Sequence, residues 1–143
     1  MNWYKKSQQK ETVQAIAFRV RSLLSSANSD DLRAMCLDAS KTLKQELIKS
    51  GYRAVVVQGT FAIDIPDPEM YSDWEEDDFE DEEQMNEAQY SPLHYWVELN
   101  DNTIIDITAD QFNDEIESEV DYMQPITIGT YSQFPRYKAL RKN

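Results

Sequence analysis

The segment from Tyr90 to Thr108 constrains the fold of this chain more than any other. It consists of two runs rich in aromatic and β-branched residues, joined by a short polar turn at residues 100–103, and this pattern predicts a β-hairpin. The first run holds His94, the only histidine of the sequence, and the second holds Asp106, an acid set among isoleucines. We therefore expect a histidine and a carboxylate on adjacent strands.

The length of the turn decides whether His94 and Asp106 share a face of the hairpin. A two-residue turn would place Asp106 on the face opposite His94, because a shift of one residue moves every side chain of a strand to the other face. A three-residue loop over 100–102 would pair Trp96 with Asp106 and make His94 its diagonal neighbour on the same face. Asn102 can adopt the left-handed conformation that such a loop needs. A shared site therefore requires the odd-length loop.

The remaining pattern predicts an α+β domain with N-terminal helices packed on an antiparallel sheet of four or five strands. Apolar residues at helical spacing predict a first helix from about Gln9 to Ser25. Further strands are expected at 52–58 in a central position, at 60–65 after a break or bulge at Gly59, and at 126–131 on an edge, since Pro125 precedes that run. We expect a loop or one helical turn over 109–116 and a basic tail over 138–143.

Cys36, the only cysteine, lies on a second predicted helix that ends at Gly51, a residue able to cap it in the left-handed conformation. Two starting points are open for this helix. Ser29 or Asp30 could cap it, which would leave Cys36 in mid-helix. Alternatively the helix starts near Met35, and Cys36 then lies over unpaired N–H groups at the positive end of the helix dipole, where thiolates are favoured.

The net charge of −13 is distributed unevenly along the chain. Residues 54–135 contain 22 acids and no Lys or Arg, whereas residues 1–53 contain ten bases against five acids and the last eight residues add four bases. Nine of the eleven residues from Asp73 to Glu83 are acidic, a density of like charge that no core can hold. Within one domain over 1–143 we therefore expect an acidic loop insertion at about 66–91. This insertion either serves only to keep the chain soluble, or it selects a basic substrate or partner.

Composition also argues against several classes of protein. The acidic surface repels phosphates, so we expect no binding of nucleic acid. The longest aliphatic run, at 54–57, is too short to span a bilayer, and no apolar segment follows the N-terminal charges, so neither a membrane span nor a signal peptide is expected. A single cysteine fits a reducing cytoplasm. One histidine and one cysteine argue against a structural zinc site, and no cofactor motif is present.

Cys36, His94 and Asp106 are together the residue types of a thiol nucleophile site. Such a site needs a cysteine ionised by its surroundings, a base that moves protons, and a group that orients the base. The structural alternative is that Cys36 is a small core residue on an apolar helix stripe and His94 an ordinary partly buried side chain.

Three runs of the sequence resemble the transglutaminase-like branch of the papain-like cysteine enzymes: Cys36–Gly59, His94-Tyr-Trp-Val-Glu98 and Ile105-Asp-Ile-Thr108. The resemblance covers roughly residues 34–112, and its pattern is a Cys at the head of a helix, then a His-x-Trp-Val-Glu strand and an Asp-x-Thr strand. It implies a papain-like minimal core in which Cys36 is the nucleophile, His94 the general base and acid, and Asp106 the residue that orients the imidazole.

The resemblance thus implies a thiol-dependent amide hydrolase or acyl transferase that forms an acyl-enzyme on Cys36 and acts on a peptide or protein, which the acidic insertion would make a basic one. Trp96 would shield the site from water. Met35 stands where the family often has glycine, and Asn28 is a guess for the second oxyanion donor. The alternative function is a non-catalytic acidic adaptor or inhibitor that binds a basic protein surface.

Overall fold

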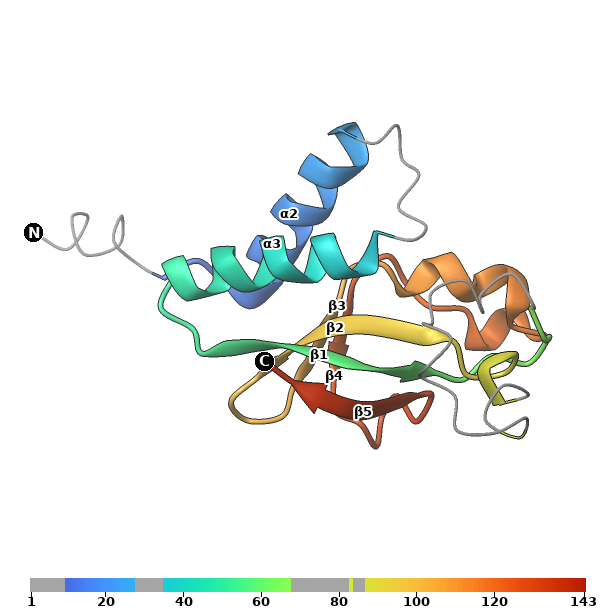
Figure 1. Cartoon of the computed structure of the whole chain (residues 1–143). Coiled ribbons are helices and arrows are strands. Elements are labelled where there is room, and N and C mark those ends of the chain that lie inside the picture. The colour runs from blue at the N-terminus through green and yellow to red at the C-terminus, as the bar shows by residue number, and fades with distance from the viewer. Residues whose placement is uncertain (1–9, 28–34, 68–82, 84–86) are drawn as a thin grey trace, which may run out of the picture.

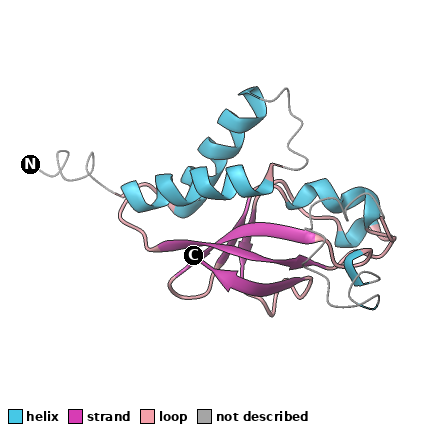
Figure 2. Cartoon of the chain, viewed as in Figure 1, coloured by secondary structure: helices cyan, strands magenta, loops and turns pink. Residues whose placement is uncertain are grey.

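The fold is α+β, with α-helices packed on one face of an antiparallel sheet, as Figures 1 and 2 show for the computed structural model of the chain. The structure describes residues 10–27, 35–67, 83 and 87–143. The elements in chain order are α2 (Val13–Ala27), α3 (Cys36–Lys49), β1 (Ala54–Phe61), β2 (Leu93–Leu99), β3 (Ile104–Asp106), the 3-10 helices η3 (Ala109–Glu115) and η4 (Glu119–Asp121), β4 (Thr127–Gly129) and β5 (Tyr137–Lys142). The predicted α+β class, with N-terminal helices on an antiparallel sheet, is confirmed.

The strand order of the sheet is β4-β3-β2-β1-β5, and each neighbouring pair is antiparallel. β1 therefore lies inside the sheet and β4 at one edge, as the apolar run after Gly51 and the proline before residue 126 predicted. Residues 109–115 form η3, which fits the expected loop or helical turn.

The hairpin of β2 and β3 has the odd-length loop. Val97 pairs with Ile105, and the Leu99 N–H donates to the Thr103 carbonyl at 2.9 Å, which leaves residues 100–102 as the loop. Asn102 has a φ of 68°, the left-handed conformation that a three-residue loop requires. The register predicted for a shared site is confirmed.

Helix α2 has a side-chain cap at its start, whereas α3 has none. α2 begins at Val13 rather than near Gln9, because the Thr12 side-chain oxygen accepts the Ala15 N–H at 3.1 Å and so caps the first turn. α3 begins at Cys36, with Met35 as its N-cap, which confirms the second of the two starting points. It ends before Gly51, whose φ of 92° is the predicted left-handed cap.

β1 runs unbroken through Gly59, so the separate strand expected at 60–65 is wrong. A Cβ at Gly59 would lie 2.1 Å from the Lys138 carbonyl oxygen and 2.4 Å from Trp96 Cη2. Glycine therefore lets the neighbouring strand and the indole approach closely. The bulge that was the other expectation for Gly59 occurs in the pairing with β5, where the register shifts and Leu140 is the extra residue.

The segment expected to be a basic tail is instead the edge strand β5. Three of its six residues are cationic, namely Lys138, Arg141 and Lys142. Charged side chains are common on edge strands because they discourage pairing with other chains. The same charges remove the apolar alternation that marks a strand in a sequence, and the prediction failed for this reason.

Each face of the sheet contributes to its own apolar cluster. Val97 and Ile105 pack with the helices on one face, while their neighbours Trp96 and Ile104 pack on the other. Arg21 fixes α2 against the end of β3 by donating to the Ile107 carbonyl at 2.6 Å. Figure 1 shows α3 crossing above the sheet, with its N-terminal end over the start of β2.

Two predictions fall on residues that are not described. Most of the acidic insertion expected at 66–91 lies outside the described residues, and so does Asn28. In the part of the chain that is described, no helix is long and apolar enough to cross a membrane.

Candidate active site

His94 and Asp106 form a buried hydrogen-bonded pair. His94 Nε2 lies 2.6 Å from Asp106 Oδ2, and the two side chains are 0% and 1% exposed. The diagonal placement that the odd-length loop predicts therefore brings the two residues together. Because Nε2 contacts the carboxylate, that nitrogen carries a proton, and Nδ1 is left as the nitrogen that can gain or lose one.

The carboxylate of Asp106 is held by two further residues. The Tyr137 hydroxyl donates to Oδ2 at 2.7 Å, while the Thr108 N–H donates to Oδ1 at 2.9 Å and the Thr108 hydroxyl at 3.3 Å. Thr108 thus explains the Asp-x-Thr pattern, because its backbone and side chain both bind the acid two residues earlier. With both oxygens engaged, Asp106 has a single orientation toward the imidazole.

The buried pair is charged. Burial raises the pKa of Asp106, but the charge and hydrogen bond of His94, with those of Tyr137 and Thr108, outweigh it and hold the pKa below its usual range. Burial lowers the pKa of His94, but the charge and hydrogen bond of Asp106 raise it, Cys36 raises it further, and the result is about 10. At neutral pH the pair is an imidazolium and a carboxylate.

Aromatic rings enclose His94. Phe112 lies edge-on at 4.9 Å between ring centroids, Trp96 lies at 5.9 Å, and Phe61 lies edge-on at 6.0 Å. Phe61 and Phe112 stack on each other at 4.6 Å. The position of the buried Trp96 agrees with the expectation that it shields this site from water. An ion pair in such a surrounding is screened less than one at the surface.

Cys36 is close enough to His94 to raise the pKa of the imidazole. His94 Nδ1 is buried and makes no hydrogen bond of ordinary geometry, but the Cys36 side chain is near enough that hydrogen bonding and charge from it both raise the pKa of the ring. Hydrogen bonds between catalytic groups are often long in ligand-free proteins and shorten when substrate binds. The three residues named from the sequence therefore lie close together. His94 and Asp106 are in direct contact, and the contact of Cys36 with His94 is the weaker of the two.

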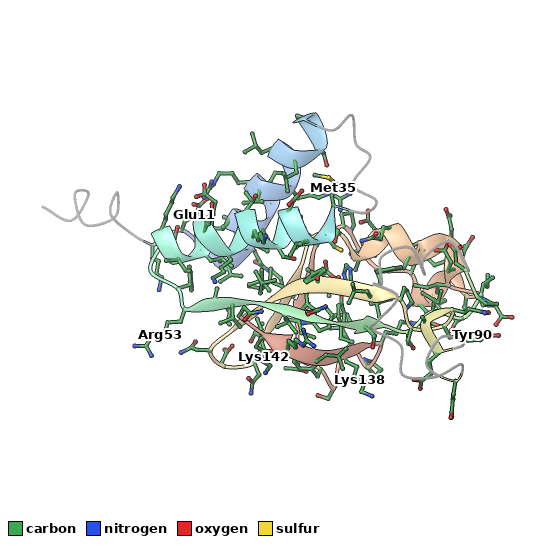
Figure 3. All side chains as sticks on the ribbon, viewed as in Figure 1. Glu11, Met35, Arg53, Tyr90, Lys138 and Lys142 are labelled. Atoms are coloured by element: carbon green, nitrogen blue, oxygen red, sulfur yellow. The ribbon has the colours of Figure 1, made fainter. Side chains whose placement is uncertain are left out.

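Cys36 is the first residue of α3 and is half-buried. Figure 3 shows Met35 at this end of the helix, above the sheet. The N-cap makes no side-chain hydrogen bond to the helix. The first N–H groups of a helix have no acceptor within it, so they are able to bind an anion at this position.

The other residues of the His-x-Trp-Val-Glu run form a second network. The Trp96 Nε1–H donates to the Tyr131 hydroxyl at 3.1 Å, and that hydroxyl donates to Glu98. Lys142 Nζ lies 2.7 Å from Glu98, which is 3% exposed. The indole that lies beside His94 is thereby fixed from β5 and from the segment that follows β4.

Three hollows formed by described residues lie elsewhere. One of about 650 Å³ is lined by η4, β4 and the segment before β5, another of about 520 Å³ by the start of β1 and the β2–β3 loop, and a third of about 260 Å³ by α3 and the inner strands. Cys36 and His94 line none of the three. We assign the candidate site to Cys36, His94 and Asp106, because the size of a hollow alone does not indicate any reaction. No cluster of three or more His, Cys, Asp or Glu residues within the described ranges could hold a metal ion.

Sequence reasoning missed Tyr137 as a member of the site. It lies on β5, 31 residues beyond Asp106, directly before the run that was expected to be a tail. The only signal in the sequence is an aromatic residue at the start of a charged run, and a partner for Asp106 cannot be identified from it.

Comparison of this chain with protein-family models, curated proteins and solved structures finds no match. The functional argument therefore rests on the geometry of Cys36, His94 and Asp106.

Proposed function

We propose that this chain is a thiol-dependent amide hydrolase or acyl transferase, similar to the transglutaminase-like cysteine enzymes, that forms an acyl-enzyme on Cys36. The observation that carries the proposal is the buried His94–Asp106 ion pair, with a 2.6 Å contact, beside a cysteine at the head of a helix. Burying two charges is costly. A purely structural role does not explain why the second ring nitrogen, Nδ1, is buried with only the Cys36 side chain near it as a partner.

The first half of the reaction uses Cys36 and His94. Attack starts from the state in which the Cys36 Sγ proton has been transferred to His94 Nδ1, and Asp106 stabilises the imidazolium. The thiolate attacks the carbonyl carbon of an amide, and the electron pair of the C=O bond moves to oxygen. When this intermediate collapses, the C–N bond breaks, the departing nitrogen takes the proton from Nδ1, and a thioester remains on Cys36.

The second half returns the enzyme to its starting state. Water or an amine attacks the thioester carbon and gives its proton to His94 Nδ1. The C–S bond then breaks, and the proton returns to the sulfur. Water as acceptor makes the protein a hydrolase, and an amine makes it a transferase.

The oxyanion formed in both halves needs hydrogen-bond donors. The Cys36 backbone N–H, at the first position of α3, is one candidate donor. We propose a peptide or protein as the substrate, because peptides and proteins carry the amide bonds on which such a thiol acts. A single cysteine and its chemistry suit a reducing compartment such as the cytoplasm.

The test compares the alkylation of Cys36 by iodoacetamide at pH 6 in the native chain and in the same chain unfolded in urea. Because Cys36 is the only cysteine, mass spectrometry reports the site without ambiguity. We expect faster alkylation in the native chain, since an imidazolium beside a sulfur favours the nucleophilic thiolate over the thiol. His94→Gln, which can still bond to Asp106, removes the advantage.

A second readout follows the acyl-enzyme. Incubation with a small activated ester is expected to acylate Cys36 in the native chain, with release of the acyl group when hydroxylamine is added. Alkylation and acylation no faster than in the unfolded chain would contradict the proposal and favour the non-catalytic adaptor.

A further inference from the structure

A groove of about 260 Å³ runs along α3, between the helix and the strands β1 and β2. Its lining includes Leu37, Lys41 and Lys44 from the helix, and Val56, Gln58 and Tyr95 from the strands. No Asp or Glu is among its lining residues. In a chain of net charge −13, this hollow is an exception to the overall charge.

The charge of the groove is positive. Lys41 is exposed and Lys44 is half-buried, with Lys44 Nζ donating to the Asn143 carbonyl at 3.2 Å. A lysine has three donors, so Lys44 keeps two for a ligand. Arg141 pairs with Gln58 across β1 and β5, and cross-strand partners point to the same face, so Arg141 adds a cation on the face of the sheet that holds the groove.

The groove includes the helix residue that follows the proposed nucleophile. Leu37 comes directly after Cys36 in α3 and is one of the lining residues, and Lys41 and Lys44 lie farther along the same helix. Along the helix, Lys41 lies about 7.5 Å and Lys44 about 12 Å beyond Cys36, at 1.5 Å per residue. An extended peptide advances about 3.3 Å per residue. Side chains about two and four residues from the attacked carbonyl are therefore within reach of the two lysines.

We propose that this groove binds an acidic, extended segment of the peptide whose carbonyl reaches Cys36, an inference that rests on the proposed function. Carboxylates two and four residues from the attacked position pair with Lys41 and Lys44. A nucleic acid also carries negative charge, but a long polyanion would meet the acidic remainder of the surface. A short peptide with a few carboxylates would contact the positive groove without reaching the acidic remainder of the surface.

The experiment measures the rate at which a peptide electrophile labels Cys36. The probe peptide carries a chloroacetamide on a central diaminopropionic acid and has Glu at the second and fourth positions on both sides of it. The comparison peptide has Gln at the same four positions. We expect the Glu peptide to label the native chain about three- to thirty-fold faster, since two exposed ion pairs supply that range. Lys41→Gln with Lys44→Gln brings the ratio close to one.

Lys49→Gln is the matched control, because Lys49 lies on the same helix outside the groove, and it leaves the ratio unchanged. The rate with neutral iodoacetamide is followed in every variant. Slow alkylation by iodoacetamide refutes the proposed function, whereas fast alkylation with a Glu-to-Gln ratio near one refutes only the acidic groove. If a short oligonucleotide blocks labelling more strongly than free Glu peptide does, the occupant of the groove is a nucleic acid and the proposal of an acidic peptide is wrong.

Discussion

Replacing Asp106 by Asn tests the central pair most directly. The Asn side-chain oxygen can still accept the Thr108 N–H, which lies 2.9 Å from Oδ1 in the native chain. The amide NH2 then faces His94 Nε2 and the Tyr137 hydroxyl, where the native carboxylate accepts two hydrogen bonds. Since an NH2 group only donates, His94 must carry its proton on Nδ1, the nitrogen that should receive one from Cys36.

The same change removes the main cause of the raised His94 pKa. Burial lowers that pKa and Asp106 raises it, so without the carboxylate the imidazole is neutral at pH 6. At that pH a free thiol is ionised to about 0.3%, and part of this loss is offset because a more basic thiolate is a better nucleophile. We therefore expect alkylation by iodoacetamide at pH 6 to slow by roughly ten-fold.

Stability falls together with reactivity. Removing one partner of a buried ion pair costs about 3–5 kcal/mol, which urea unfolding measures. Asp101→Asn is the control, because the exposed Asp101 accepts the Thr103 N–H with an oxygen that Asn retains. Equal alkylation of Asp106→Asn and the native chain at pH 6, in a folded variant, would refute the argument that the carboxylate activates the thiol through His94.

Three further predictions follow from the same region. Tyr137→Phe removes one hydrogen bond to the buried carboxylate and lowers the free energy of unfolding in urea by about 1.5–3 kcal/mol; an unchanged value contradicts the bond's importance. Because the His94 pKa is raised from 6.5 to about 10, its stabilisation is complete below pH 6.5 and is lost as the pH rises through about 10. The free energy of unfolding falls between pH 7 and 10, and Asp106→Asn must show a smaller fall. Gly59→Ala, whose Cβ would lie 2.1 Å from the Lys138 carbonyl, costs at least about 3 kcal/mol in the same assay, and a milder loss would mean that β5 can move away.

Much of the site could be predicted because it depends on local rules. The face shared by His94 and Asp106 follows from loop length, and loop length follows from a residue, Asn102, that tolerates a positive φ. The position of Cys36 remained open between two helix starts, because no side-chain cap marks the observed start at Met35. Local patterns therefore predicted the pair and left its distance from the thiol undetermined.

What could not be predicted depends on contacts between distant segments. Strand β1 continues through Gly59 because Trp96 and β5 need the space that a Cβ would fill, and no local pattern contains that information. The edge strand β5 was missed because its cations hide the apolar alternation. With β5 the prediction also lost Tyr137, the partner of Asp106 that lies farthest away in the chain.

The hydrogen bond from Tyr137 to Asp106 has a consequence for synthesis on the ribosome. Translation produces Cys36, His94 and Asp106 well before Tyr137, and β5 can dock on β1 only after that residue has been made. The charged pair that would activate the sulfur is therefore incomplete in a nascent chain. On the proposed function, Cys36 would gain its activating pair only once the sheet has received β5.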